Sequence, residues 1–231
     1  TMDVQTFEDP EGLAAGAADL ITSVLSDTEG RADIGLAGGS TPQAAYAELR
    51  TRPVEWGLVD IWLSDERWVA HDSDESNGNQ AARSLVDGIS AASFLRPRFS
   101  EHLEPVDSAA YYEARLRSVI RARPKLVLLG MGTDGHTASL FPGTDAVSDS
   151  SDRWFVANHV PQLDTWRLTV TPHLLEIVEH IAVIGSGGAK ADVLAEAIDR
   201  PAGRYPIEII HRSEAKVTVL CDQAAAASLA L

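Results

Sequence analysis

The sequence contains very little cysteine. Cys221 is the only cysteine among 231 residues, which excludes an internal disulfide. A lone thiol fits a reducing compartment, and we expect a cytoplasmic protein. No apolar run approaches the ~20 residues that a membrane-spanning helix needs. Residues 1–4 show no basic stretch followed by an apolar one, so we expect no signal peptide.

Basic residues are also scarce. The chain has 19 Lys and Arg against 34 Asp and Glu, a formal net charge of −15. This balance argues against nucleic acid or an anionic membrane surface as the main partner. If the ligand is an anion, a local group of cations and backbone N–H groups must hold it against the field of the whole protein.

What the sequence has in quantity is hydrophobic residues, 45% of the total, arranged in alternating strand-like and helix-like segments. We find no repeat or linker, and we expect one domain over residues 1–231. The alternation predicts an α/β fold with a mostly parallel, Rossmann-like sheet and helices on both faces. Strands are expected at 34–37, 59–63, 125–130, 154–158, 167–171, 180–185 and 216–220. Helices are expected at 10–27, 41–50, 76–89, 108–122, 172–178, 189–198 and 222–231.

Small or charged residues follow four of the predicted strands. Ligands of such folds bind at the carboxyl ends of the strands. One cluster at a strand end would mean little, but four together favour a binding site. The four clusters are Gly38 to Pro42, Ser64 to Trp68, Gly130 to His136, and Gly185 to Lys190.

The Gly38-Gly39-Ser40-Thr41 turn indicates an anion site. Glycines let the backbone approach a ligand closely, and the unpaired N–H groups of the next helix favour negative charge. A plain glycine turn is the alternative, with Thr41 as helix cap and Pro42 at the first helical position. The Gly185 to Lys190 cluster repeats the pattern and adds a lysine that either reaches a phosphate or is simply solvated. Neither cluster is a Walker loop.

The cluster after the third strand contains a candidate general base. Gly130 to Gly135 matches G-x-G-x-x-G, but Phe141-Pro142-Gly143 stops any following helix, which argues against a dinucleotide site. A lone histidine is usually structural. His136, however, follows Asp134 in a glycine-rich loop, and such a pair can accept a proton near neutral pH.

The Asp65-Glu66-Arg67 cluster has two readings. It is either a surface ion pair, or an arginine that meets substrate oxygens while the carboxylates fix its position. The polar segment 69–76 that follows is expected to be a surface or lid loop.

These motifs together resemble the 6-phosphogluconolactonase family, in the wider group that includes glucosamine-6-phosphate deaminases. The resemblance covers roughly residues 5 to 225 and keeps the order of five motifs. They are Leu36 to Pro42, Asp65 to Trp68, Ser76 to Asn79, Gly130 to Pro142, and Gly185 to Lys190.

The resemblance implies a deaminase-like fold and hydrolysis of 6-phosphoglucono-δ-lactone to 6-phosphogluconate, in the oxidative pentose phosphate pathway. It also implies a cytoplasmic enzyme that needs neither metal nor organic cofactor and has a small sugar-phosphate lactone as its partner. We expect a monomer. The deaminase relatives carry a Glu after the histidine that assists ring opening. Residues 137–142 contain no carboxylate, which favours the lactonase. A non-catalytic sugar-phosphate sensor is a further alternative.

We expect the site residues to have the following roles in this reaction, with Arg167 assigned by its correspondence to a phosphate-binding arginine of the deaminase relatives. His136 would take a proton from water, and Asp134 would orient its ring. Arg67, or backbone N–H groups near Gly39, would face the oxyanion, and Ser139 is an alternative nucleophile. The residues expected to bind the substrate or its phosphate are Gly38, Gly39, Ser40, Thr41, Asp65, Arg167 and Lys190.

Overall fold

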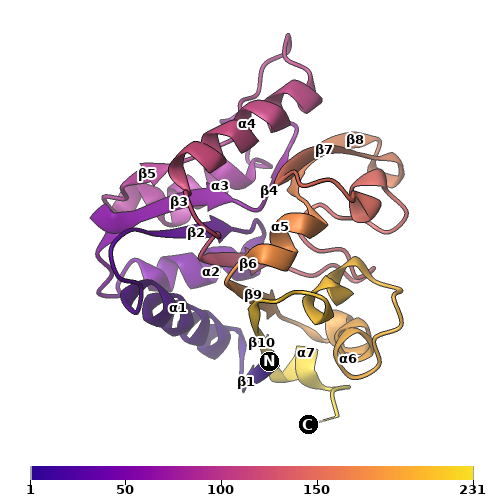
Figure 1. Ribbon diagram of the computed structural model, residues 1–231. Coiled ribbons are helices and arrows are strands. Elements are labelled where there is room, and N and C mark those ends of the chain that lie inside the picture. Colours follow the sequence, from indigo (N-terminus) through magenta and orange to yellow (C-terminus); the bar gives the residue numbers. More distant parts are fainter. Residues whose placement is uncertain (1, 231) are drawn as a thin grey trace.

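A parallel sheet of seven strands forms the centre of the molecule (Figure 1). The computed structural model describes residues 2–230, and the bounds below refer to these. The strand order is β1-β10-β9-β6-β2-β3-β5, and every pairing is parallel. The strands are β1 Met2–Phe7, β2 Ala32–Leu36, β3 Val59–Leu63, β5 Ser93–Phe94, β6 Leu126–Leu129, β9 His180–Gly185 and β10 Lys216–Asp222.

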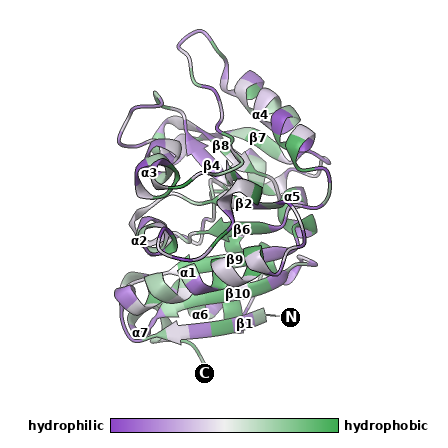
Figure 2. Cartoon of the chain, turned by 90° about the vertical axis from the view of Figure 1, so that its left-hand side faces the viewer, coloured by the Kyte–Doolittle hydropathy of each residue, from purple (hydrophilic) through white to green (hydrophobic). Residues whose placement is uncertain are grey.

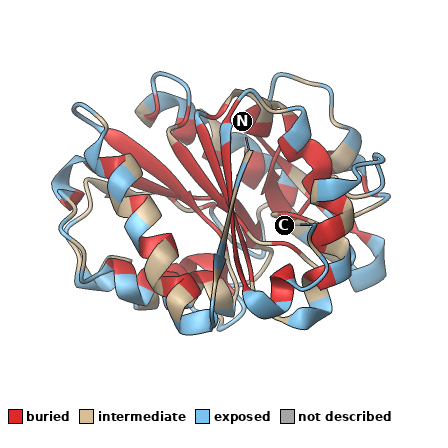
Figure 3. Cartoon of the chain, turned by 90° about the horizontal axis from the view of Figure 1, so that it is seen from below, coloured by how far each residue is buried: buried red, intermediate tan, exposed pale blue. Residues whose placement is uncertain are grey.

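Helices cover both faces of this sheet, and a hydrophobic core lies against each face (Figure 3). One core includes side chains of α1 Pro10–Ser26, α2 Ser40–Leu49 and α3 Asn77–Ser84. The other includes side chains of α4 Pro105–Val119, α5 Pro172–Ile177, α6 Ala191–Asp199 and α7 Gln223–Ala226. Short 3₁₀ helices occur at Trp56–Leu58, Val86–Gly88, Asp145–Ser148, Pro161–Leu163, Gly188–Lys190 and Pro206–His211.

The central strands β2, β3, β6, β9 and β10 are almost wholly buried. Their residues are largely Val, Ile, Leu and Ala, which is typical of parallel strands covered on both faces. Figure 2 shows hydrophobic residues concentrated in β6, β9 and β10. Among the described residues, none of the helices is long and apolar enough to cross a membrane. The predicted α/β class with a mostly parallel sheet is confirmed.

A second, smaller sheet corrects part of the prediction. The segments expected as strands at 154–158 and 167–171 do not join the main sheet. They form β7 Phe155–Val160 and β8 Thr165–Val170, which pair antiparallel with β4 Asp65–Arg67 in the order β4-β8-β7. The unexpected strand β4 begins two residues after β3 ends, so the chain passes directly from one sheet to the other.

Several predicted bounds were also wrong. The helix expected at 76–89 ends at Ser84, and the helix expected at 222–231 ends at Ala226, with Asp222 as its cap. The helix expected at 108–122 covers 105–119, where Pro105 suits a first helical position. Strands β1 and β5 were not expected, because β1 is a half-exposed edge strand and β5 has only two residues.

The order of the strands determines where the site lies. From β2 the chain moves outward through β3 to β5, then returns to place β6 on the other side of β2. Between β2 and β6 the connections therefore leave in opposite directions. In open α/β sheets such a switch point leaves a crevice at the carboxyl ends of the strands, where ligands bind. The loops after β2 and β6 are the ones that begin with Gly38 and Gly130.

Candidate active site

The four strand-end clusters meet at one cavity of about 290 Å³. The loop after β2 and the loop after β6 form two of its sides, as the switch point requires. Arg67 and Asp65 come from β4, and Lys190 from the loop after β9. The other lining residues are Ala37, Gly38, Gly39, Ser40, Thr41, Pro42, Asn77, Gly130, Met131, Gly132, His136, Ala138 and Ile184.

Helix α2 begins at Ser40, two residues before Pro42, the expected first helical position. Gly39 is the N-cap, with φ of 104° and no side-chain hydrogen bond. Only glycine adopts this conformation without strain, and it turns the chain into the helix early. The Thr41 hydroxyl is therefore not used as a cap. The Gly39 N–H donates to Gln80 Oε1 at 3.3 Å, so the donors left for a ligand are the amides in the first turn of α2.

His136 and Asp134 form a hydrogen-bonded pair. The distance from His136 Nδ1 to Asp134 Oδ1 is 2.6 Å, and the same oxygen accepts the His136 N–H at 3.2 Å. Burial by itself raises the pKa of Asp134, but these hydrogen bonds and the charge of His136 outweigh it and hold the pKa below its usual value. A carboxylate only accepts hydrogen bonds, so Nδ1 carries a proton, and in the neutral imidazole Nε2 has the free lone pair. In this state His136 can act as a base.

The surroundings of His136 fix the plane of its ring. Phe141 stacks on the imidazole with 4.2 Å between ring centroids. Gly132 lies so close that an added Cβ would stand 2.2 Å from His136 Nδ1 and 2.6 Å from Asp134 Oδ1. On the far side, Ile207 N–H donates to the carbonyl of Gly135 at 3.1 Å. The base is thus held by its own loop and by the segment after α6.

Asp65 is 7% exposed and is held at both oxygens. Its Oδ1 accepts from Asn77 Nδ2 at 3.1 Å, and its Oδ2 accepts from Ser139 Oγ at 2.7 Å. Because the Ser139 hydroxyl donates to a buried carboxylate, Ser139 is a support for Asp65 rather than a free nucleophile. The carboxylate of Asp65 is in this way fixed at the wall of the cavity.

The neighbouring Glu66 fixes the backbone of Arg67 but not its guanidinium, because its Oε1 accepts the Arg67 N–H at 2.8 Å. Glu66 is 4% exposed and accepts from Ser76 Oγ and from the N–H groups of Asn77 and Gly78 at 2.6 to 2.9 Å. It therefore anchors the start of α3. Burial raises the pKa of Glu66, although these hydrogen bonds oppose the shift. The guanidinium of Arg67 is held instead by a backbone carbonyl, that of Glu75, at 2.8 Å.

Arg67 and Arg167 face each other across the small sheet. They are paired in register between β4 and β8. Burial, followed by the positive charge of Arg67, lowers the pKa of Arg167, and neighbouring carboxylates oppose the shift. Within residues 2–230, neither arginine forms an ion pair with a carboxylate. Arg167 does not line the cavity itself but lies beside a residue that does. Two adjacent cations that form no ion pair favour an anion nearby.

Lys190 enters the cavity from the loop after β9. We had expected Lys190 to lie just inside a helix. It is instead the residue before α6. Burial lowers the pKa of Lys190, and the charge of Asp222 partly offsets the shift. Asp222 also accepts the Gly187 N–H at 3.1 Å and the Ser186 hydroxyl, and so ties the loop to the end of β10.

Asn77 is the site residue to which sequence reasoning gave no role. Its amide holds Asp65, while its Oδ1 is buried and has no hydrogen-bond partner within residues 2–230. An added Cβ at Gly38 would stand 1.9 Å from this oxygen, so Gly38 is needed for Asn77 to fit. The Ser76 to Asn79 motif was the available signal.

Among the described residues, no group of three or more His, Cys, Asp or Glu side chains is placed to hold a metal ion.

Comparison with known sequences gives a consistent result. Residues 8–219 match the family described as glucosamine-6-phosphate isomerases/6-phosphogluconolactonase. A 6-phosphogluconolactonase of Rhizobium meliloti is 33% identical over 203 residues, 84% of this chain and 87% of the relative. Another, from Nostoc sp., is 30% identical over 240 residues and covers 99% of this chain and 98% of its own.

Solved structures share the same architecture. The crystal structure of a 6-phosphogluconolactonase from Shewanella baltica aligns with a TM-score of 0.85 at 26% identity, over 96% of this chain and 98% of that one. A monomeric glucosamine-6-phosphate deaminase aligns with a TM-score of 0.81 at 21% identity, over 98% and 100%, which confirms the predicted deaminase-like fold. The chain therefore belongs to the family of glucosamine-6-phosphate isomerases and 6-phosphogluconolactonases.

Proposed function

We propose that this protein hydrolyses 6-phospho-D-glucono-1,5-lactone to 6-phospho-D-gluconate, in the oxidative pentose phosphate pathway. The observation that carries the proposal is the His136–Asp134 pair at the wall of a cavity that also presents cations for a phosphate. Relatives named 6-phosphogluconolactonase, at about one third identity over most of the chain, support the same reaction.

The reaction needs one base and no covalent intermediate. Nε2 of His136 takes a proton from a water molecule while the water oxygen bonds to the lactone carbonyl carbon. The carbonyl oxygen becomes an oxyanion. When the tetrahedral intermediate collapses, the bond from this carbon to the ring oxygen breaks, and the ring oxygen takes the proton back from the imidazolium. Asp134 stabilises the imidazolium through Nδ1.

The cations of the site are proposed to serve two negative groups, the 6-phosphate of the substrate and the oxyanion that forms during the reaction. Arg67 lines the cavity and is proposed to face the oxyanion, where a positioned donor contributes most. The first turn of α2, the hydroxyls of Ser40 and Thr41, Lys190 and Arg167 are proposed to hold the 6-phosphate. Asp65, whose two carboxylate oxygens are held in place, is suited to accept hydrogen bonds from hydroxyl groups of the sugar.

We further propose that residues 1–231 act as one lactonase domain, as a monomer in the cytoplasm. The first and last strands of the chain, β1 and β10, pair with each other in the main sheet, which supports a single folding unit. A lone buried cysteine fits a reducing compartment.

The test is a coupled assay in which glucose 6-phosphate is oxidised to fresh lactone and the decay of the lactone is followed. Decay should accelerate in proportion to protein above the unaided rate. His136→Ala should lower kcat by about 10²- to 10⁴-fold with an unchanged melting temperature, because it removes only the base. His102→Ala, at an exposed histidine, is the matched control. Near-normal turnover in His136→Ala would remove the base assignment, and no acceleration by the wild-type protein would reject the lactonase.

A further inference from the structure

A second cationic cavity lies outside the active site, between the edge of the main sheet and helix α4. Its volume is about 290 Å³, equal to that of the active-site cavity. The connection from β5 to α4, which rises above the rest of the molecule in Figure 1, forms one wall, and α4 forms the other. It is lined by Phe94, Leu95, Arg96, Arg98, Tyr111, Tyr112 and Arg115.

The charge of this lining is unusual for the chain. Three of its seven residues are arginines and none is acidic, although acidic residues outnumber basic ones 34 to 19 overall. Within residues 2–230, Arg96, Arg98 and Arg115 form no ion pair with a carboxylate. Three like charges gathered without counterions repel one another, and a bound anion would remove this repulsion.

Arg96 is the fixed member of the group. Its Nη2 donates to the carbonyl of His71 and to Ser76 Oγ, both at 3.1 Å. Its Nε is buried and has no hydrogen-bond partner among the described residues. The guanidinium packs against Gly78, where an added Cβ would stand 2.3 Å from Nε. Such an unpaired buried donor is costly, and it belongs to a group whose partners elsewhere are carboxylates and phosphates.

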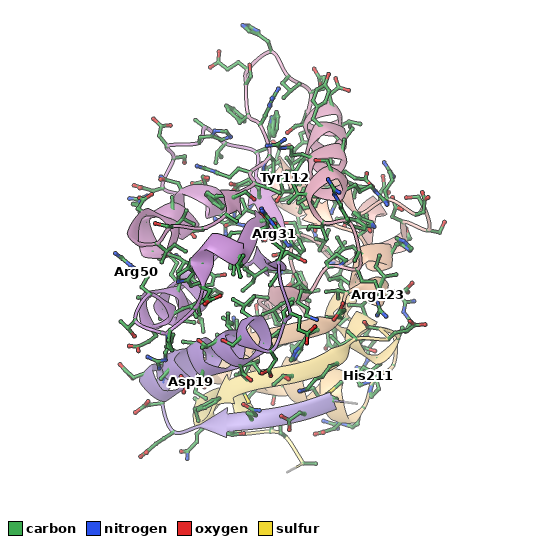
Figure 4. All side chains as sticks on the ribbon, turned by 60° about the vertical axis from the view of Figure 1, so that its left-hand side comes forward. Asp19, Arg31, Arg50, Tyr112, Arg123 and His211 are labelled. Atoms are coloured by element: carbon green, nitrogen blue, oxygen red, sulfur yellow. The ribbon has the colours of Figure 1, made fainter. Side chains whose placement is uncertain are left out.

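The remaining walls are aromatic and apolar. Tyr112, labelled in Figure 4, is a buried residue of α4, and its hydroxyl accepts the Leu63 N–H at 2.7 Å. Tyr111 is 60% exposed at the rim of the cavity. The Phe94 ring lies below the Arg96 guanidinium, with 5.7 Å between the ring centroid and Arg96 Cζ. Rings of this kind pack against the apolar face of a sugar or a base, while the arginines meet a charged group.

We propose that this cavity binds a small organic phosphate. Guanidinium groups bind phosphate oxygens in a bidentate manner, and three arginines line this space of about 290 Å³. The site is separate from the cavity of His136, with which it shares no lining residue. The proposal stands independently of the lactonase activity, because its test measures binding.

The test is isothermal titration calorimetry with inorganic pyrophosphate as the probe, which measures the number of bound molecules and their dissociation constants. The wild-type chain should bind two molecules, each with a dissociation constant below about 1 mM. Lys190→Ala weakens the active site and should leave one. The double variant Arg98→Gln/Arg115→Gln should also leave one, and it should keep the lactonase kcat and KM. The double variant Arg121→Gln/Arg200→Gln changes the net charge equally at exposed arginines elsewhere and should bind two.

Several outcomes would overturn the proposal. They are no binding to the wild type, the same number of molecules on Arg98→Gln/Arg115→Gln as on the wild type, or an equal loss in the charge-matched control. Melting temperatures are compared first, to confirm that each variant is folded. If the double variant is unstable, Arg115→Gln alone removes one exposed guanidinium and should weaken the second site at least tenfold. Unchanged affinity there would equally reject the site.

Discussion

At the scale of single residues, the active site depends on where side chains are absent. Gly132 leaves the space that the His136–Asp134 pair occupies, and Gly38 leaves the space for Asn77. Neither glycine has a positive φ, so the need is for room rather than for backbone freedom. The sequence shows glycines near the site but not which side chain each one admits, because that depends on contacts made only in the folded chain.

Gly132→Ala should therefore impair catalysis. Its Cβ would stand 2.2 Å from His136 Nδ1, and the imidazole would have to move. A displacement of about 1 Å at a reacting group can cost about 10²-fold in rate, and we expect a loss of that size in kcat with little change in melting temperature. Gly57→Ala is the matched control, since an added Cβ there meets no atom within 4 Å. Wild-type kcat in Gly132→Ala would show that the pair is not held as described.

Sequence reasoning selected some site residues but did not assign the roles of others. Asp134, His136 and Lys190 were selected by their residue types and positions, because such residues at a strand end are uncommon. Ser139 and Asn77 support Asp65 from other parts of the chain, 74 and 12 residues away in sequence. No local pattern marks such contacts. Glu66 was read with Arg67 as one charge cluster, but alternation along β4 sends neighbouring side chains to opposite faces.

At the scale of elements, the small antiparallel sheet is what brings two arginines together. Pairing of β4 with β8 sets Arg67 opposite Arg167, two residues 100 positions apart. The sequence predicted most strands of both sheets from runs of apolar and β-branched residues. It did not separate the two sheets, since hydrophobic alternation identifies a strand but not its partner. The strand–helix alternation did suffice for the main sheet.

The two arginines should respond differently to truncation. Arg67→Ala should lower kcat by about 10²- to 10³-fold, because the proposed oxyanion contact exists only in the transition state. Arg167→Ala should instead raise KM by about 10- to 100-fold, the value of a hydrogen bond to a charged group, with kcat largely kept. Steady-state kinetics on fresh lactone separates the two effects, with Arg200→Ala as the exposed control. If Arg67→Ala changes KM alone, its oxyanion role is refuted; an unchanged KM in Arg167→Ala removes that residue from the phosphate site.

At the scale of the whole molecule, two buried groups with strongly shifted pKa values lie at the end of the sheet opposite to the functional residues. The site is at the carboxyl ends of the strands. Asp33 in β2 and His180 at the start of β9 lie near the amino ends. Burial raises the pKa of Asp33 to about 7, against the hydrogen bonds from Trp62 Nε1 at 2.8 Å and Lys125 N–H at 3.0 Å. Burial, followed by the charge of Lys216, lowers the pKa of His180 to about 4.

These two groups affect stability in opposite directions as the pH falls from 7 to 4. Folded Asp33 takes up a proton at higher pH than the unfolded chain does, so acidification through this range favours the folded state at Asp33. His180 has the opposite effect. It is protonated near pH 6.5 in the unfolded chain but only near pH 4 in the folded state, so acidification favours the unfolded state at His180. The stability that neutral His180 provides is complete above pH 6.5 and is lost on acidification.

His180→Gln should remove the second effect. Glutamine does not titrate and keeps a polar group near Thr218 Oγ1, which His180 Nε2 contacts at 2.9 Å. The free energy of unfolding, measured with urea at pH 7 and pH 4.5, should fall less in the variant than in the wild type. We expect the difference to be about 1–2 kcal/mol, below the full linkage value, because His180 takes up part of its proton already at pH 4.5 and the surrounding charges are screened. Comparing the two proteins at each pH cancels the contribution of Asp33, and His102→Gln controls for an exposed histidine. Parallel pH profiles for the wild type and His180→Gln would show that His180 takes up its proton equally in the folded and unfolded states.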